Sequence, residues 1–332
     1  MSPTPDMDSL HASCDAATVE GAAYDVAIVG GGPAGLTAAM WLGRYLHRVV
    51  LVDSGDPRNW QTRGVNGYLG LPDVTPATLR GAGRHEARRQ GAELVDGCVD
   101  KITRQAEGDF RLALESGDVY DAKRVLLAFG VRDVWPEIPG LEKIFGSTAY
   151  HCPDCDGHET RGKKTAVIGV GRRAVGLALA LATWTRELVV CTNGADPELT
   201  EPLLAQLDTL NIPVLTSRIT CAQHTDRILH ALEFEDGMLL DCERLFFQMG
   251  HYPADDLAQR LGCERNDEEC IIIDEHHHTS VEHVYAAGDL VPGTQIALSA
   301  AAGGAKAAIA IHRSLLAPEF IIAPPPRNIT AL

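Results

Sequence analysis

Two glycine-rich turns, each placed between a β-branched run and a helix-forming segment, constrain the fold of this chain more than any other feature. The first is Gly30-x-Gly32-x-x-Gly35, which follows a strand predicted over residues 24–30. The next predicted strand ends at Asp53, where a carboxylate can accept hydrogen bonds from ribose hydroxyls. A strand–turn–helix–strand unit of this kind, about 30 residues long, predicts a dinucleotide-binding fold.

The pattern recurs as Gly169-x-Gly171-x-x-Ala174, with Arg172 and Arg173 inside the turn. Alanine in the third position still allows the helix to pack closely on the strand. NADPH would favour cations at the end of the following strand, and NADH would favour an acid there. The sequence at that point is Cys-Thr-Asn and supplies neither. These five turn residues therefore form a candidate second nucleotide site, and a fold element that no longer binds a nucleotide stays open as the alternative.

Apolar periodicity gives the remaining elements of an α/β protein. Predicted helices cover residues 36–46, 78–90, 175–185 and 295–316. Predicted strands cover 47–52, 110–120, 124–130, 164–169, 187–191, 213–220, 229–234, 244–249, 271–274 and 284–289. The basic run 80–89 is interpreted as a solvated helix face.

Length and charge limit the class of protein. A chain of 332 residues suggests two domains, and 32 glycines suit tight strand-to-helix turns. The formal net charge of −16 repels phosphate backbones and anionic membranes, so we expect no nucleic acid and no membrane among its partners. Residues 1–22 lack the basic start and apolar core of a signal peptide, so we expect a disordered tail and a cytoplasmic protein.

One close pair of cysteines stands out among nine, Cys152 and Cys155. A structural zinc needs four ligands, and no second C-x-x-C is present, so we predict no metal. A redox-active disulfide is favoured over inert thiols, since Asp156 directly after the pair supplies an acid that can protonate a leaving thiolate.

A second strand-to-turn junction complements the first dinucleotide turn. The strand over 284–287 ends in Gly288-Asp289, which can aim a carboxylate at a polyol chain. Together with the first turn this predicts an FAD site, with Asn66 as a further polar contact. The residues predicted to bind FAD are Gly30, Gly32, Pro33, Ala34, Gly35, Asp53, Asn66, Gly130, Gly288 and Asp289.

These motifs together resemble the low-molecular-weight thioredoxin reductase family of FAD-dependent pyridine nucleotide–disulfide oxidoreductases, over residues 24–316. The placement of C-x-x-C-Asp-Gly just before the second turn is specific to that group. The resemblance implies two Rossmann-like domains of three layers (ββα): an FAD domain over 23–134 and 251–317, and an NAD(P)-type domain over 135–250 that carries the C-x-x-C. It also implies a homodimer. Residues 318–332 depart from the family, because they extend beyond its usual C-terminus, and we expect them to form a C-terminal tail.

The resemblance further implies roles for the site residues. Cys155 would face the flavin, Cys152 would exchange with a thioredoxin-like protein or a small dithiol or disulfide, and Asp156 would be the acid–base residue. Gln295 and Ile296 would contact the flavin ring, where Thr294 replaces the usual arginine.

The departures from the family concern the electron donor. A pyridine nucleotide, NADPH or NADH, is the leading expectation, although the family's basic signature after the second turn is missing. Relatives driven by ferredoxin, or dithiol oxidases that use oxygen, are the alternatives, and a non-catalytic flavoprotein redox sensor is a third. Phe320 in the tail is considered as a cover for the flavin.

Overall fold

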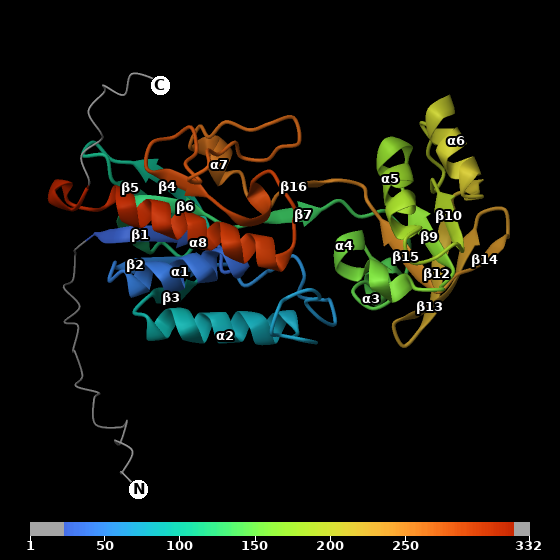
Figure 1. Ribbon diagram of the computed structural model, residues 1–332, viewed down its shortest axis with the longest axis horizontal. Helices are drawn as coiled ribbons and strands as arrows, with labels where there is room; N and C mark the ends of the chain where they lie inside the picture. Colours follow the sequence, from blue (N-terminus) through green and yellow to red (C-terminus); the bar gives the residue numbers. More distant parts are fainter. Residues whose placement is uncertain (1–22, 322–332) are drawn as a thin grey trace, which may run out of the picture.

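The computed structural model describes residues 23–321. The predicted tail 1–22 and most of the predicted tail 318–332 lie outside the described residues. The chain forms two α/β units, each built on its own parallel sheet and placed side by side in Figure 1. Within residues 23–321, no helix combines the length and the apolar character needed to cross a membrane.

The first unit takes strands from both ends of the chain. Its parallel strands run in the order β3-β2-β1-β6-β17, and β5 and β4 continue the sheet in antiparallel fashion beyond β6. These strands are β1 (Tyr24–Val29), β2 (Val49–Asp53), β3 (Glu93–Asp96), β4 (Val99–Arg104), β5 (Phe110–Leu114), β6 (Val119–Leu127) and β17 (Val284–Ala286). Three helices accompany them, α1 (Pro33–Arg44), α2 (Pro76–Arg89) and α8 (Ala297–Ser314).

Two cores hold this unit together, one on each face of the central strands. Val26 and Ile28 of β1 pack into a core shared with α1 and α8, whereas Ala27 and Val29 pack into a core shared with β4, β5 and β6. Successive side chains of a strand point to opposite faces, so a strand buried on both faces has a continuous apolar sequence. The layers are therefore helices, parallel sheet and antiparallel strands.

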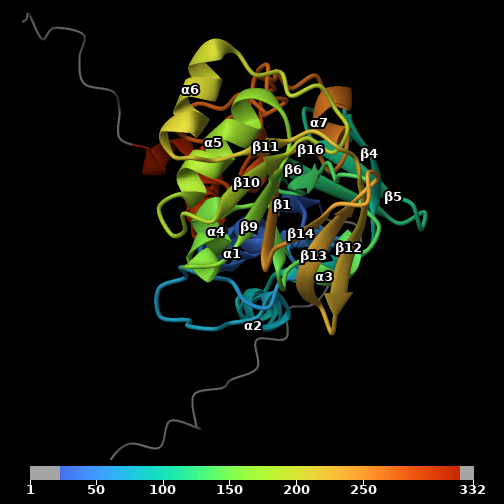
Figure 2. The ribbon, with the colours of Figure 1, turned by 90° about the vertical axis from the view of Figure 1, so that its right-hand side faces the viewer.

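The second unit repeats this plan on a smaller scale. Its strands run in the order β11-β10-β9-β15-β8, all parallel. Figure 2 shows α5 and α6 on one side of this sheet and a three-stranded antiparallel sheet on the other. The elements are β8 (Ala149–Tyr150), β9 (Thr165–Ile168), α5 (Gly171–Leu181), β10 (Leu188–Cys191), α6 (Glu201–Thr209), β11 (Val214–Leu215), β12 (Ile219–Thr225), β13 (Ile228–Phe234), β14 (Leu239–Asp241) and β15 (Arg244–Phe247).

A two-stranded ribbon joins the units. Strand β7 (Val131–Asp133) leaves the first sheet, and β16 (His251–Pro253) returns to it, and the two pair in antiparallel fashion (Figure 1). The remaining elements are short: α3 (Leu141–Ile144), α4 (Pro153–Asp156), η2 (Gly157–Thr160), α7 (Leu257–Arg260), η3 (Gly288–Leu290) and η4 (Pro318–Phe320). The predicted class, α/β with two Rossmann-like units, is confirmed.

Three local predictions differ from the structure. The strand predicted over 271–274 is wrong, because Ile271 forms only an isolated bridge with Arg265. The first helix begins at Pro33 rather than Leu36, since proline is well suited to the first helical position. The basic run on α2 is not wholly solvated, because Arg84 is buried and Arg80 is partly so.

Candidate active site

A cavity of about 610 Å³ extends from the first glycine-rich turn to the disulfide. Both ends of the chain contribute to it, because β1 and β17 place their turns at the same edge of the sheet. Of the residues predicted to bind FAD, all but Gly35 line this cavity. The lining residues are Gly30, Gly32, Pro33, Ala34, Asp53, Asn66, Gly130, Gly288, Asp289, Gln295 and Ile296.

The first turn is shaped to hold a pyrophosphate. Gly32 is the N-cap of α1 and makes no side-chain cap, and the space where a side chain at Gly32 would project is open. Gly35 lies behind the cavity, where a Cβ would come within 1.9 Å of the Gly30 carbonyl oxygen. Glycine is therefore required at 35 for packing, and the open N-terminus of α1 fits an anionic group. These residues fit FAD.

Asp53 lies at the end of β2, as predicted, and two arginines of α2 hold its carboxylate. Arg84 Nη1 donates to Asp53 Oδ2 over 2.8 Å, and Arg80 contacts the same oxygen. The second oxygen, Oδ1, accepts from the Gly55 N–H. A carboxylate has about four lone-pair positions, so Asp53 retains acceptor capacity toward a ribose hydroxyl. The interpretation of residues 80–89 as a solvated face is wrong for these two arginines.

The cysteine pair lies at the start of the short helix α4. Cys152 and Cys155 form a disulfide, with Cα atoms 5.3 Å apart. The backbone N–H of Cys155 donates to Cys152 Sγ over 3.1 Å. This N–H lies in the first turn of α4, where backbone N–H groups have no acceptor within the helix. Such a donor stabilises a thiolate on Cys152 once the disulfide is reduced. Residue 157, the last of the motif, must be glycine, because a side chain there would collide with the ring of Trp184.

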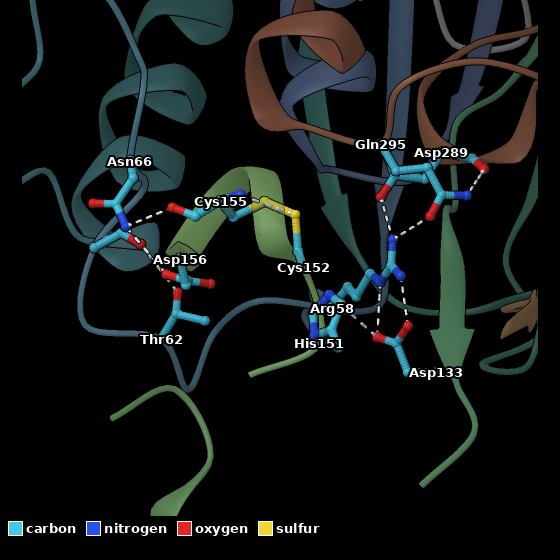
Figure 3. Close-up of a disulfide and its surroundings, with 11 residues drawn as sticks. Arg58, Thr62, Asn66, Asp133, His151, Cys152, Cys155, Asp156, Asp289 and Gln295 are labelled. Carbon is cyan, nitrogen blue, oxygen red and sulfur yellow. Dashed lines mark hydrogen bonds and ion pairs between the residues drawn. A yellow bond between two sulfur atoms is a disulfide. The ribbon is translucent and has the colours of Figure 1, made fainter. Parts of the chain in front are cut away.

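Asp156 lies beside the disulfide and is held by Asn66 from the loop after β2 (Figure 3). Asn66 Nδ2 donates to the Cys155 carbonyl oxygen over 3.0 Å and to Asp156 Oδ1 over 3.1 Å. Burial and the neighbouring charge of Glu159 raise the pKa of Asp156 to about 7, against a smaller lowering by the Asn66 hydrogen bond. A carboxyl group with this pKa exists in both protonation states near neutral pH, as proton transfer requires.

A second cavity of about 420 Å³ adjoins the disulfide from the other side. Cys152 lines both cavities, whereas Cys155 lines only the first. Arg173 of the second glycine-rich turn, His251 of β16 and Cys270 also line the second cavity. Both cysteines therefore border the first cavity, and of the two only Cys152 also borders the second.

A cluster around Arg58 was missed by sequence reasoning. Arg58 Nε donates to Asp133 Oδ2 over 2.8 Å, and Nη1 donates to Asp289 Oδ2 over 3.0 Å and to Gln295 Oε1 over 2.9 Å (Figure 3). Burial acts to raise the pKa of Asp133, but the hydrogen bonds of Arg58, together with the charges of His151 and Arg58, outweigh it and leave that pKa below its ordinary value. The available signal was the placement of Asp133 and His251 beside the predicted domain boundaries, at residues 134–135 and 250–251, because a charge buried between two units needs a partner.

The second glycine-rich turn opens α5 as predicted. Ala174 is buried against the turn, and a Cβ at Gly169 would lie 3.3 Å from the Ala174 Cβ. Arg172 and Arg173 are both exposed, and Arg173 lines the second cavity. Phe320 is 71% exposed in η4 and lines neither cavity, so within the described residues it does not cover the flavin cavity.

The chain is similar to known proteins in both sequence and structure. A family model described as pyridine nucleotide-disulphide oxidoreductase matches residues 24–305. The chain is 34% identical over 179 residues to a protein of Arthroderma benhamiae named "Probable thioredoxin reductase", a match that covers 52% of this chain and only 44% of that protein. It is 29% identical over 280 residues to thioredoxin reductase tcpT of Claviceps purpurea, covering 80% of this chain and 86% of that one. The crystal structure of HlmI superposes with a TM-score of 0.84 at 33% identity, covering 88% of this chain and 92% of that one.

The fold and the site thus define an FAD-dependent disulfide oxidoreductase. The chain belongs to the pyridine nucleotide-disulphide oxidoreductase family, in the low-molecular-weight, thioredoxin reductase-like group that the sequence resembles. FAD is its cofactor, and when bound in the first cavity it accepts or supplies a pair of electrons.

Proposed function

We propose that the enzyme passes two electrons between FAD and an external dithiol or disulfide by exchange at Cys152–Cys155. The observation that carries the proposal is the position of the disulfide between the two cavities. Cys155 lines only the flavin cavity and Cys152 also lines the second one, which supports Cys155 as the sulfur nearer the flavin and Cys152 as the exchanging sulfur.

The chemistry of the exchange balances within the disulfide and its substrate. In the direction of dithiol oxidation, a substrate thiolate attacks Cys152 Sγ, the Cys152–Cys155 bond breaks, and Asp156 protonates the departing Cys155 sulfur. The second substrate thiolate then attacks the substrate sulfur of the mixed disulfide. Cys152 leaves as a thiolate that the Cys155 N–H stabilises. The substrate is oxidised to its disulfide, and the cysteine pair is reduced to the Cys155 thiol and the Cys152 thiolate.

The second cavity favours a compact partner. A volume of about 420 Å³ suits a small-molecule dithiol or disulfide, and Arg173 adds a cation to its wall. A thioredoxin-like protein remains the partner that the names of the relatives suggest, and ferredoxin remains a candidate donor. Rates with reduced thioredoxin and with small dithiols at equal thiol concentration distinguish these partners. A homodimer and a cytoplasmic location stay predictions, and sedimentation of the FAD-loaded protein tests the first.

The pKa of Asp156 near 7 supports turnover over the alternative of a redox sensor that binds partners without catalysis. A sensor requires only that the disulfide opens and closes. An acid whose pKa lies near 7, which directly follows Cys155 and is hydrogen-bonded by Asn66, is a feature of a group that transfers protons repeatedly.

The roles of the two cysteines are tested with the FAD-loaded variants Cys155→Ser and Cys152→Ser. Neither variant can form the internal disulfide. We expect Cys155→Ser to form a mixed disulfide with an aryl disulfide reagent at least about tenfold faster than Cys152→Ser. The reason is that Cys152, which remains in Cys155→Ser, lines the second cavity, and its sulfur accepts a hydrogen bond from the residue 155 N–H. Cys221→Ser is the matched control and should behave as wild type. Faster labelling of Cys152→Ser would reverse the proposed roles.

A further inference from the structure

The chain contains the same nucleotide-binding turn twice, and the two copies differ in what lies against their second glycine. At Gly32 in the first unit, the space where a side chain would project holds no atom within 4 Å. At Gly171 in the second unit, a Cβ would lie 3.3 Å from Glu198 Oε2 and 3.6 Å from the Cβ of Glu198. The second glycine of this motif is where a dinucleotide pyrophosphate approaches the backbone. Glu198 therefore stands where a pyrophosphate would lie.

The backbone donor of the second turn is also used. The Gly171 N–H, at the start of α5, donates to the carbonyl oxygen of Pro197 over 2.9 Å. Free N–H groups at such a helix start are the donors that bind phosphate oxygens. Pro197 supplies a neutral oxygen, and Glu198 adds a carboxylate beside it. Both features disfavour a second anion at the same place.

The residues after β10, where a nucleotide would be selected, also hydrogen-bond to other parts of the chain. Asn193 Oδ1 accepts from the Ile219 N–H over 2.8 Å, and Thr192 Oγ1 donates to the Ala195 carbonyl oxygen over 2.7 Å. The Gly194 N–H donates to the Thr216 carbonyl oxygen over 3.0 Å. The polar groups nearest the expected ribose position thus bind the chain itself, and these bonds fix the path that carries residues 194–199 back over the turn.

We propose that residues 194–199 fill the second nucleotide site and that Glu198 excludes pyridine nucleotides from it. Pro197 O and the Glu198 carboxylate take the positions that pyrophosphate oxygens would occupy at the start of α5. The second turn then serves another purpose, since its Arg173 lines the cavity beside Cys152. The consequence for electron flow rests on the proposed function of the disulfide: electrons enter as a dithiol through Cys152 rather than as a hydride from NADPH or NADH.

Direct binding to the FAD-loaded full chain tests the exclusion. We expect calorimetric titration with NADPH, and separately with NADH, to give no binding tighter than about 1 mM. Amide hydrogen exchange of peptides covering residues 170–175 and 194–199 should be the same with and without nucleotide. A wild-type protein that binds either nucleotide in the micromolar range, or gains protection in both peptides, would overturn the proposal.

The variant Glu198→Ala tests the excluding group, with Glu201→Ala as a matched control. Both variants remove one carboxylate from the same part of the surface, but Glu201 lies in the first turn of α6 and is not among the atoms against Gly171. Because a carboxylate held beside a phosphate weakens its binding, we expect NADPH to bind Glu198→Ala at least about tenfold more tightly than Glu201→Ala. Equal affinities would remove Glu198 from this role. Circular dichroism and FAD content verify that both variants fold.

Reduction of the flavin by dithiothreitol distinguishes the filled nucleotide site from the proposed exchange at Cys152–Cys155. Anaerobic bleaching of the flavin by dithiothreitol, with no bleaching by NADPH or NADH, supports both. Bleaching by dithiothreitol together with tight nucleotide binding overturns the filled site and leaves the exchange chemistry intact. No bleaching by dithiothreitol, with nucleotide still unbound, overturns the exchange chemistry and leaves the filled site standing.

Discussion

Replacing Asp156 by asparagine isolates the proton transfer. Asparagine keeps the shape and still offers an oxygen to Asn66, but it cannot protonate the departing Cys155 sulfur. With a pKa of about 7, the wild-type carboxyl group is about nine-tenths protonated at pH 6 and about one-hundredth protonated at pH 9. General acid catalysis contributes roughly 100-fold or more. The rate ratio of wild type to Asp156→Asn should therefore be about 100 at pH 6 and fall to near 1 by pH 9.

The assay is anaerobic stopped-flow bleaching of the flavin by dithiothreitol, which follows the half-reaction that needs the acid. Taking the ratio of the two proteins at each pH cancels the changing thiolate content of the reagent. Asp154→Asn, in the same helical turn, is the matched control, and its ratio to wild type should not vary with pH. A ratio for Asp156→Asn that stays constant from pH 6 to pH 9 would refute the reasoning.

The same pKa has a consequence for stability. The carboxyl group of Asp156 ionises near pH 7 in the folded protein and near its ordinary value of 3.8 when unfolded. Between about pH 4 and pH 7 the folded state thus holds more protons, and its stability falls as the pH rises. Asp156→Asn lacks this dependence. Its advantage in free energy of unfolding should be absent at pH 4 and reach up to about 4 kcal/mol at pH 8. Thermal unfolding midpoints of both proteins across this window measure it, and parallel curves would contradict it.

Two further changes probe the groups that hold the site. Asn66→Ala removes a hydrogen bond that lowers the pKa of Asp156, so the decline of the bleaching rate, measured on the FAD-loaded protein, should move to higher pH; an unmoved profile would separate Asn66 from the acid. Arg58→Ala removes the arginine that pairs with the largely buried Asp133 and Asp289. We therefore expect the free energy of unfolding to fall by about 3 kcal/mol, seen as a lower midpoint of thermal unfolding. Arg58→Lys should recover part of that loss, and a midpoint equal to wild type for Arg58→Ala would show that the cluster is not structural.

Most of the fold was predicted from short local sequence motifs. A β-branched run, a glycine-rich turn and a helix former lie within one short stretch, so their geometry follows from nearest neighbours along the chain. The predicted elements that failed lacked this support. Residues 271–273 are apolar and β-branched, but among residues 23–321 their only strand-type pairing is the bridge from Ile271 to Arg265. The short strands β3 and β4 carry mixed polar sequences and were not predicted.

The candidate site was predictable to the same extent. The C-x-x-C-Asp sequence and the first turn mark a disulfide and a flavin cavity, and the structure joins them. The partners of these groups come from distant segments: Asn66 reaches Asp156 across 90 positions, and Arg58 reaches Asp289 across 231. No pattern in a single sequence encodes such a pairing, because it depends on how the sheets pack.

By itself, the sequence determined that this protein has two dinucleotide turns, a dithiol pair with an acid beside it, and an α/β architecture to hold them. Tertiary structure decided which turn is open. Gly32 faces a cavity and Gly171 faces Glu198, although the two motifs look alike in the sequence. The difference arises in the segment after the next strand, whose path back over the start of α5 is set by hydrogen bonds that Asn193 Oδ1 and the Pro197 carbonyl oxygen accept. A motif fixes the local backbone, whereas the space in front of that backbone belongs to whichever part of the chain folds against it.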